Sequence, residues 1–75
     1  MHKNAAQRLQ VLEILYVALE GQPKAPWVNI REIQKLGDME FALEALLRLG
    51  HAERNGFNWQ ITGAGMLEYE AQTAD

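Results

Sequence analysis

Residues 46–65 constrain the fold of this chain more than any other part of its sequence. They begin with the apolar end of a helical pattern, and Gly50 follows where a left-handed residue commonly ends a helix. Asn55-Gly56 is a strong signal for a tight β-hairpin, because the central residues of such a turn need positive φ. Thr62 then stands where a hydroxyl caps the next helix. The segment therefore predicts a hairpin and a final helix, over residues 51–61 and 63–71.

The alternation along the hairpin predicts its register and its buried face. A two-residue loop at Asn55-Gly56 pairs Arg54 with Phe57 and Ala52 with Trp59. Ala52, Trp59 and Ile61 then lie toward the core.

Apolar residues before the hairpin recur at the helical spacing of three and four. Asn29 and Asp38 precede two of these patterns and are expected to be N-caps. Trp27-Val28 is expected to form a short strand against the hairpin. We expect three helices, over residues 5–19, 30–36 and 39–49.

The third of these helices has two different faces. One is apolar and is expected to be buried, and it contains Met39, Ala42, Leu43, Leu46 and Leu49. The other contains Glu40, Phe41, Glu44, Ala45 and Arg48. Two interpretations of Phe41 stay open: an exposed anchor for a protein partner, or a core residue if the helix is rotated by one position.

The composition limits the size and chemistry of the protein. The 75 residues, 48% of them hydrophobic, predict one domain over residues 1–75 with a small core. Because the chain has no Cys, disulfides cannot stabilise it, and packing or association must do so. The net charge of −3 opposes non-specific nucleic-acid binding.

Residues that commonly support catalysis are scarce. The chain has no Ser and no Cys, and His2 and His51 have no partner at metal-binding spacing. We therefore expect no enzyme activity, no cofactor and no metal site. No apolar run approaches 18 residues, so we expect no signal peptide or membrane span and a cytoplasmic location.

The order helix, short strand, helix, turn, helix, hairpin, helix resembles the winged helix-turn-helix family of prokaryotic transcriptional regulators. The resemblance rests on four segments, residues 30–37, 42–50, 50–56 and 59–65. This resemblance implies a mainly α fold with a small β-hairpin (α+β). It also implies that the third helix reads the major groove, that residues near the second helix meet phosphates, and that the wing touches the DNA backbone or minor groove.

The resemblance and the residue pattern suggest two functions. Both are compatible with a homodimer that forms through the first helix. The first is DNA binding in transcription regulation, with the candidate residues Asn29, Arg31, Lys35, Glu40, Glu44, Arg48, Arg54 and Asn55. The alternative is a non-enzymatic protein-interaction module that uses Glu40, Phe41, Glu44 and Ala45. The third helix favours the alternative, because Asp38, Glu40 and Glu44 outnumber Arg48.

Overall fold

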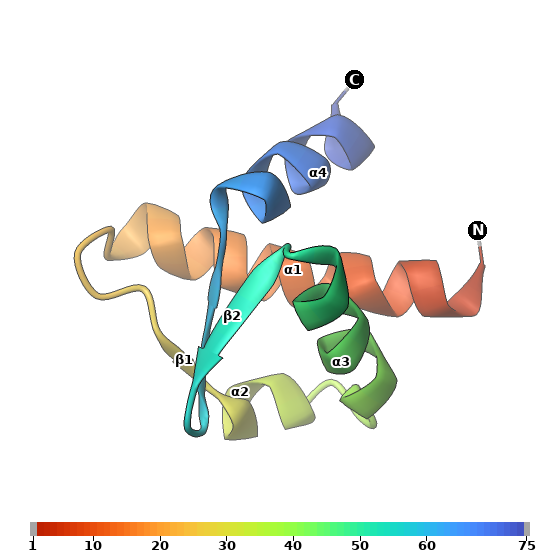
Figure 1. The fold of residues 1–75 in the computed structure, drawn as a ribbon, viewed down its shortest axis with the longest axis horizontal. Helices are drawn as coiled ribbons and strands as arrows, with labels where there is room; N and C mark the ends of the chain where they lie inside the picture. Colours follow the sequence, from red (N-terminus) through yellow and green to blue (C-terminus); the bar gives the residue numbers. More distant parts are fainter. Residues whose placement is uncertain (1, 75) are drawn as a thin grey trace.

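In a computed structural model that describes residues 2–74, the chain forms four α-helices and a three-stranded antiparallel sheet (Figure 1). The elements are, in chain order, α1 (Lys3–Gly21), β1 (Val28–Asn29), α2 (Ile30–Gln34), α3 (Glu40–Leu49), β2 (Ala52–Asn55), β3 (Asn58–Ile61) and α4 (Gly63–Thr73). The predicted α+β class is confirmed. No helix within residues 2–74 is long and apolar enough to cross a membrane.

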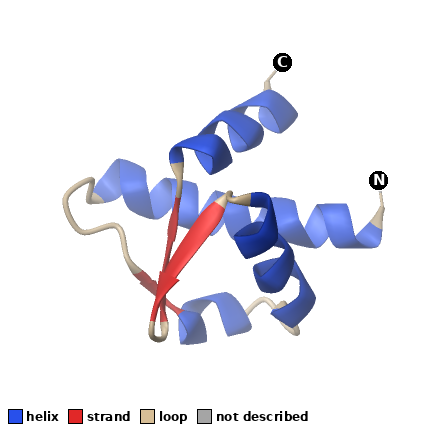
Figure 2. Cartoon of the chain, viewed as in Figure 1, coloured by secondary structure: helices blue, strands red, loops and turns tan. Residues whose placement is uncertain are grey.

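The sheet has the strand order β1-β3-β2, so the short β1 extends the hairpin at its β3 edge (Figure 2). Val28 pairs with Trp59, and Ala52 pairs with Ile61. The predicted strand against the hairpin is confirmed, although it begins one residue later, at Val28. Its connection to the hairpin places the start of α2 next to the hairpin tip, where the Ile30 N–H donates to the Phe57 carbonyl at 2.8 Å.

The core lies between α1, α3 and the inner face of the sheet. Helix α1 contacts α3, β3 and α4, and it runs behind the hairpin and α3 in Figure 1. Its apolar stripe is fully buried at Val11, Leu12 and Leu15. The remaining buried apolar residues come from every later element except α4 and include Ile33, Ala42, Leu43, Leu46, Ala52, Trp59 and Ile61.

A compact joint connects α3, the hairpin and α4. Gly50 ends α3 with φ +74°, as predicted. The Thr62 hydroxyl accepts a hydrogen bond from the Gly65 N–H at 3.1 Å and donates one to the Gly50 carbonyl at 2.6 Å. The predicted Thr62 cap is confirmed, and it also fixes α4 to the end of α3.

The helix bounds differ from the predictions by a few residues. Helices α1 and α4 extend to Gly21 and Thr73, beyond the predicted ends at 19 and 71. Helix α2 stops at Gln34 instead of residue 36. The reason is that the Leu36 and Gly37 N–H groups donate to the carbonyls three residues before them, as in a 3₁₀-helix. Helix α3 begins at Glu40, with Met39 at the cap position, but the Asp38 carboxylate still accepts from the Glu40 N–H at 3.2 Å.

The predicted turn position was wrong by one residue. Asn55 pairs with Asn58, so the loop is Gly56-Phe57 and Arg54 pairs with Trp59. Gly56 has φ +63°, whereas Phe57 does not have a positive φ. One positive φ at the first central position excludes the I′ turn that Asn-Gly favours. The shift keeps the predicted core side, because Ala52, Trp59 and Ile61 are all buried.

Several large apolar residues lie at the surface, among them Leu49, which was expected to be buried. Leu36, Leu49 and Leu67 are exposed, as is Trp27. Leu36 follows the early end of α2, and Leu49 occupies the last turn of α3. In α4 the partly buried residues against the core are instead Met66 and Tyr69.

Candidate functional site

The outward side of α3 carries an exposed aromatic residue between carboxylates. We call Glu40, Phe41, Glu44, Ala45 and Arg48 the α3 face. Phe41 is 61% exposed, and Glu40, Glu44 and Arg48 are also exposed. Ala45 is half-buried. The structure therefore decides the open question about Phe41, which lies at the surface and outside the core.

The packing of α3 explains this rotation. Ala42, Leu43 and Leu46 are buried, and α3 contacts α1 through its buried side. At 100° per residue, the residues between these positions must face away from α1. Phe41 is thus exposed because the neighbouring core positions are already occupied by aliphatic side chains.

Two of the candidate cations, Arg48 and Lys35, are engaged in ion pairs. Arg48 lies 3.5 Å from the Glu44 carboxylate on α3, and Lys35 lies 3.1 Å from Glu32 beside α2. Both pairs are solvent-exposed, so they contribute little to folding stability. They do matter for recognition, because a phosphate would have to compete with a neighbouring carboxylate for each cation.

A hollow of about 600 Å³ opens between α2, α3 and the hairpin. Its apolar lining comes from Ile30, Met39, Leu43, Leu47 and Trp59. Its charged lining comes from Asp38, Glu40, Glu44 and Arg54. We call this site the α2–α3 hollow; it combines an apolar floor with three carboxylates and one guanidinium.

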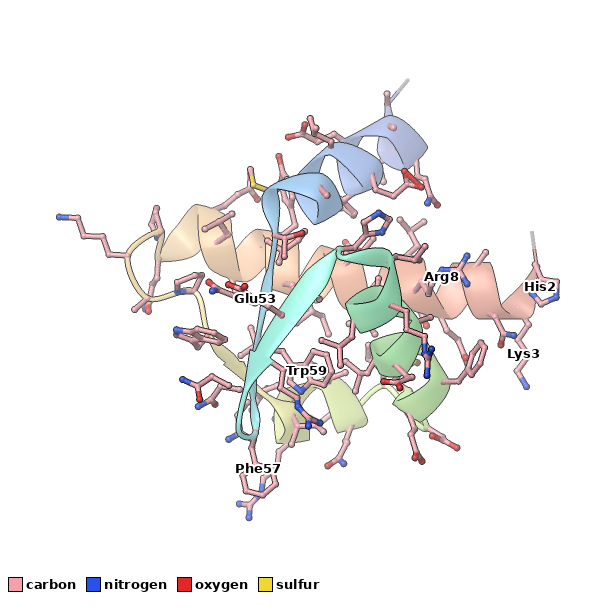
Figure 3. The ribbon with its side chains drawn as sticks, viewed as in Figure 1. His2, Lys3, Arg8, Glu53, Phe57 and Trp59 are labelled. Atoms are coloured by element: carbon pink, nitrogen blue, oxygen red, sulfur yellow. The ribbon has the colours of Figure 1, made fainter. Side chains whose placement is uncertain are left out.

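Trp59 is the aromatic part of that floor. Its side chain extends from the hairpin toward α3, whereas Glu53 points to the other side of the sheet (Figure 3). Trp59 is 2% exposed, and its Nε1–H has no hydrogen-bond partner among residues 2–74. The Arg54 guanidinium carbon lies 5.9 Å from the centre of the Trp59 ring, within the range of a cation–π contact.

A second hollow lies at the tip of the hairpin. It has a volume of about 460 Å³ and is lined by Asn29, Ile30, Arg31, Gln34 and Phe57. Phe57 is 74% exposed and projects from the tip (Figure 3). The Asn29 side chain caps α2 by accepting from the Arg31 N–H at 2.9 Å. The tip thus presents one cation and one aromatic ring, with Asn29 already engaged by the backbone.

The predicted site residues are divided between these places. Glu40 and Glu44 border both the α3 face and the α2–α3 hollow, and Arg54 joins them in the hollow. Asn29 and Arg31 lie at the hairpin tip, and Lys35 and Asn55 line neither hollow. Leu43 and Trp59, which the sequence pattern predicts in the core, also line the α2–α3 hollow. Phe57, which the sequence pattern does not predict as a site residue, lies at the hairpin tip because the turn is shifted.

Remote from these surfaces, Tyr16 has an altered acidity. A hydrogen bond to the Glu70 carboxylate raises the pKa of Tyr16 to about 12, with smaller effects from desolvation and nearby negative charge. This hydroxyl joins α1 to α4 and is not near the hollows. Among residues 2–74, no three His, Asp or Glu side chains gather in a group that could hold a metal ion.

Comparison of the chain with protein-family models, with curated proteins and with solved structures finds no match.

Proposed function

We propose that this chain is a winged-helix protein-interaction module that binds a partner protein through the α3 face. The order of the helices, with a three-stranded sheet ending in a hairpin beside α3, supports the winged-helix assignment. One observation carries the function: Phe41 is 61% exposed on a helix whose core contacts are complete without it. An exposed aromatic residue on a rigid helix is a common anchor of protein interfaces.

The charges around Phe41 favour a protein partner over a phosphate backbone. Glu40 and Glu44 flank it, and Asp38 lies just before the helix, while Arg48 is the one cation of α3. Duplex DNA would bring its phosphates close to these carboxylates, and like charges repel at short range. A partner that presents an apolar pocket with basic residues around it would meet three carboxylates, Asp38, Glu40 and Glu44, and one cation, Lys3, in the hollow beside Phe41.

The test of this proposal compares two exposed apolar residues on different elements. Phe41→Ala and Leu67→Ala each truncate an exposed apolar residue, 61% exposed on α3 and 70% exposed on α4. Chains with and without each substitution are used as bait in an extract of the source cells, and bound proteins are quantified by mass spectrometry. We expect Phe41→Ala, but not Leu67→Ala, to remove specific partners. Equal recovery by all three baits would contradict the proposal.

DNA binding is the second candidate, and the hairpin tip favours it. Arg31 and the exposed Phe57 line one hollow there, and Arg54 is exposed on the same hairpin. In a winged helix these positions would approach the phosphate backbone while α3 enters the major groove. An NMR titration with a mixed-sequence duplex at low salt tests this function. Salt-sensitive shifts at Arg31, Lys35, Arg48 and Arg54 would support it, and their absence at millimolar DNA would exclude it.

A homodimer through α1 is a separate proposal about assembly. Val17 supports it as an exposed aliphatic residue on a helix that is otherwise largely covered by α3, α4 and β3. Sedimentation at several protein concentrations tests it. A concentration-dependent mass that Val17→Asp abolishes is the expected result, and a constant monomer mass would exclude the dimer.

A further inference from the structure

We propose that the α2–α3 hollow receives an apolar side chain of a peptide whose neighbouring residues are Lys or Arg. This inference rests on the proposed interaction function and names the chemistry of the partner. The hollow adjoins the α3 face, since Glu40 and Glu44 line it while Phe41 stands next to them on the outer side. A single bound segment can therefore contact Phe41 and fill the hollow.

The floor of the hollow is suited to an aliphatic or aromatic side chain. Met39, Leu43 and Trp59 are largely buried, so their positions are fixed by the core before any partner arrives. A volume of about 600 Å³ accommodates a large side chain and part of its backbone. Rigid, preformed contacts reduce the entropy that a partner loses on binding.

The rim determines which flanking residues the peptide should carry. Asp38, Glu40 and Glu44 line the hollow, whereas Arg54 is its one cation. Of these carboxylates, Glu44 is paired with Arg48, through an exposed contact of 3.5 Å. The excess of negative charge favours an incoming ammonium or guanidinium group and disfavours a carboxylate.

Trp59 supplies a second observation at the same place. It lines the hollow, and its buried Nε1–H lacks a hydrogen-bond partner among the described residues. Because Trp59 lines the hollow, its indole N–H signal serves as a spectroscopic reporter of a side chain that enters there. Trp27 is exposed on the segment before β1 and does not line this hollow, so it serves as the internal reference.

The experiment uses three capped tripeptides and the indole N–H signals of the ¹⁵N-labelled protein. The probes are acetyl-Arg-Leu-Lys-amide, acetyl-Arg-Gly-Lys-amide and acetyl-Glu-Leu-Glu-amide. We expect the first to shift the Trp59 signal at millimolar concentration, with little change at Trp27. The peptide without an apolar side chain and the acidic peptide should each bind at least about 10-fold more weakly.

Charge reversal then locates the effect. Glu40→Lys combined with Glu44→Lys should abolish binding of the basic peptide and improve binding of the acidic one. Glu53→Lys is the control for a charge reversal elsewhere, because this exposed carboxylate lies on the opposite side of the sheet and pairs there with Gln60. We expect it to leave binding within about 2-fold, since distant exposed charges are screened by salt.

Several results would overturn the inference. They are the absence of any Trp59 shift with the basic peptide, equal binding of the acidic peptide, and equal loss of binding in the Glu53→Lys control. Phe41→Ala separates this inference from the proposed function. If partner capture depends on Phe41 but no peptide enters the hollow, the interaction function stands and the hollow inference fails. If the basic peptide binds but Phe41→Ala leaves partner capture unchanged, the inference about the hollow stands and the proposed function of the α3 face fails.

Discussion

The Tyr16 hydroxyl donates a 2.6 Å hydrogen bond to the Glu70 carboxylate, and this contact joins α1 to α4 across 54 residues of sequence. The two helices also meet through the rings of Tyr16 and Tyr69, whose centres lie 4.7 Å apart. Since α4 contributes little to the buried core, these contacts and the Thr62 cap hold it in place.

The Tyr16–Glu70 bond predicts a loss of stability at alkaline pH. Glu70 raises the pKa of Tyr16 from its ordinary value of 10 to about 12, so the folded state holds the proton more tightly than the unfolded state. The resulting stabilisation is fully present below pH 10 and is lost as the pH rises through 12. We expect Tyr16→Phe to lower the free energy of unfolding at pH 8, and this deficit should shrink above pH 10. Urea unfolding across this pH range measures the difference.

Tyr69→Phe is the matched control for that prediction. It keeps an aromatic ring against Tyr16 and leaves the Tyr16–Glu70 bond intact. Its unfolding free energy should therefore not show the same pH-dependent difference from the original chain. A Tyr16→Phe deficit that stays constant from pH 8 to pH 12 would show that the hydrogen bond is not its cause.

Gly65 is required at the start of α4 because of its close approach to the hairpin. A Cβ added there would lie 2.0 Å from the His51 carbonyl oxygen and 2.7 Å from the Ile61 side chain. Because one of these neighbours is backbone, the clash cannot be relieved by a rotamer change alone. We expect Gly65→Ala to destabilise the fold by about 1–3 kcal/mol or more, measured by urea unfolding.

Gly63→Ala provides the comparison within the same helix turn. No atom lies within 4 Å of a Cβ added at Gly63, so stability should be unchanged or raised by up to about 1 kcal/mol. Equal destabilisation by both substitutions would mean that any methyl group added at the start of α4 lowers the stability, and that the contact with His51 is not the cause.

The Thr62 hydroxyl makes two hydrogen bonds that Ser can preserve and Val cannot. It accepts from the Gly65 N–H and donates to the Gly50 carbonyl. Thr62→Val should cost about 0.5–2 kcal/mol, the usual range for loss of an N-cap. Thr62→Ser should retain most of that stability in the same thermal or urea measurement. Similar losses for both would assign the effect to packing of the Thr62 methyl group.

Local signals in the sequence were enough to predict the order of elements. Gly50, Asn29 and Thr62 act through backbone groups within a few residues, and all three have their predicted roles in the structure. The turn was misplaced because Asn55-Gly56 and Gly56-Phe57 both satisfy a tight hairpin. In the structure Asn58 pairs with Asn55 in β2 and with Asn29 in β1, and turn residues alone do not report such a tertiary contact.

The site was harder to predict than the fold. Helical periodicity placed Phe41 on the outer side of α3 but could not exclude a rotation of one residue. The packing of Ala42 and Leu46 against the rest of the core decides it. The α2–α3 hollow could not be foreseen, since Trp59 and Leu43 have the same apolar signature whether they end in the core or border an opening.

The proposed function depends most on a predicted difference in folding stability: truncation of Leu46 should destabilise the protein, whereas truncation of Phe41 should not. Leu46 is fully buried in α3, so Leu46→Ala should leave a cavity and cost about 2–5 kcal/mol. Phe41 is 61% exposed, so Phe41→Ala should change the free energy of unfolding by no more than about 0.5 kcal/mol. Urea unfolding followed by circular dichroism measures both. If Phe41→Ala were as destabilising as Leu46→Ala, Phe41 would be part of the core, and the reason to regard the α3 face as a binding surface would be lost.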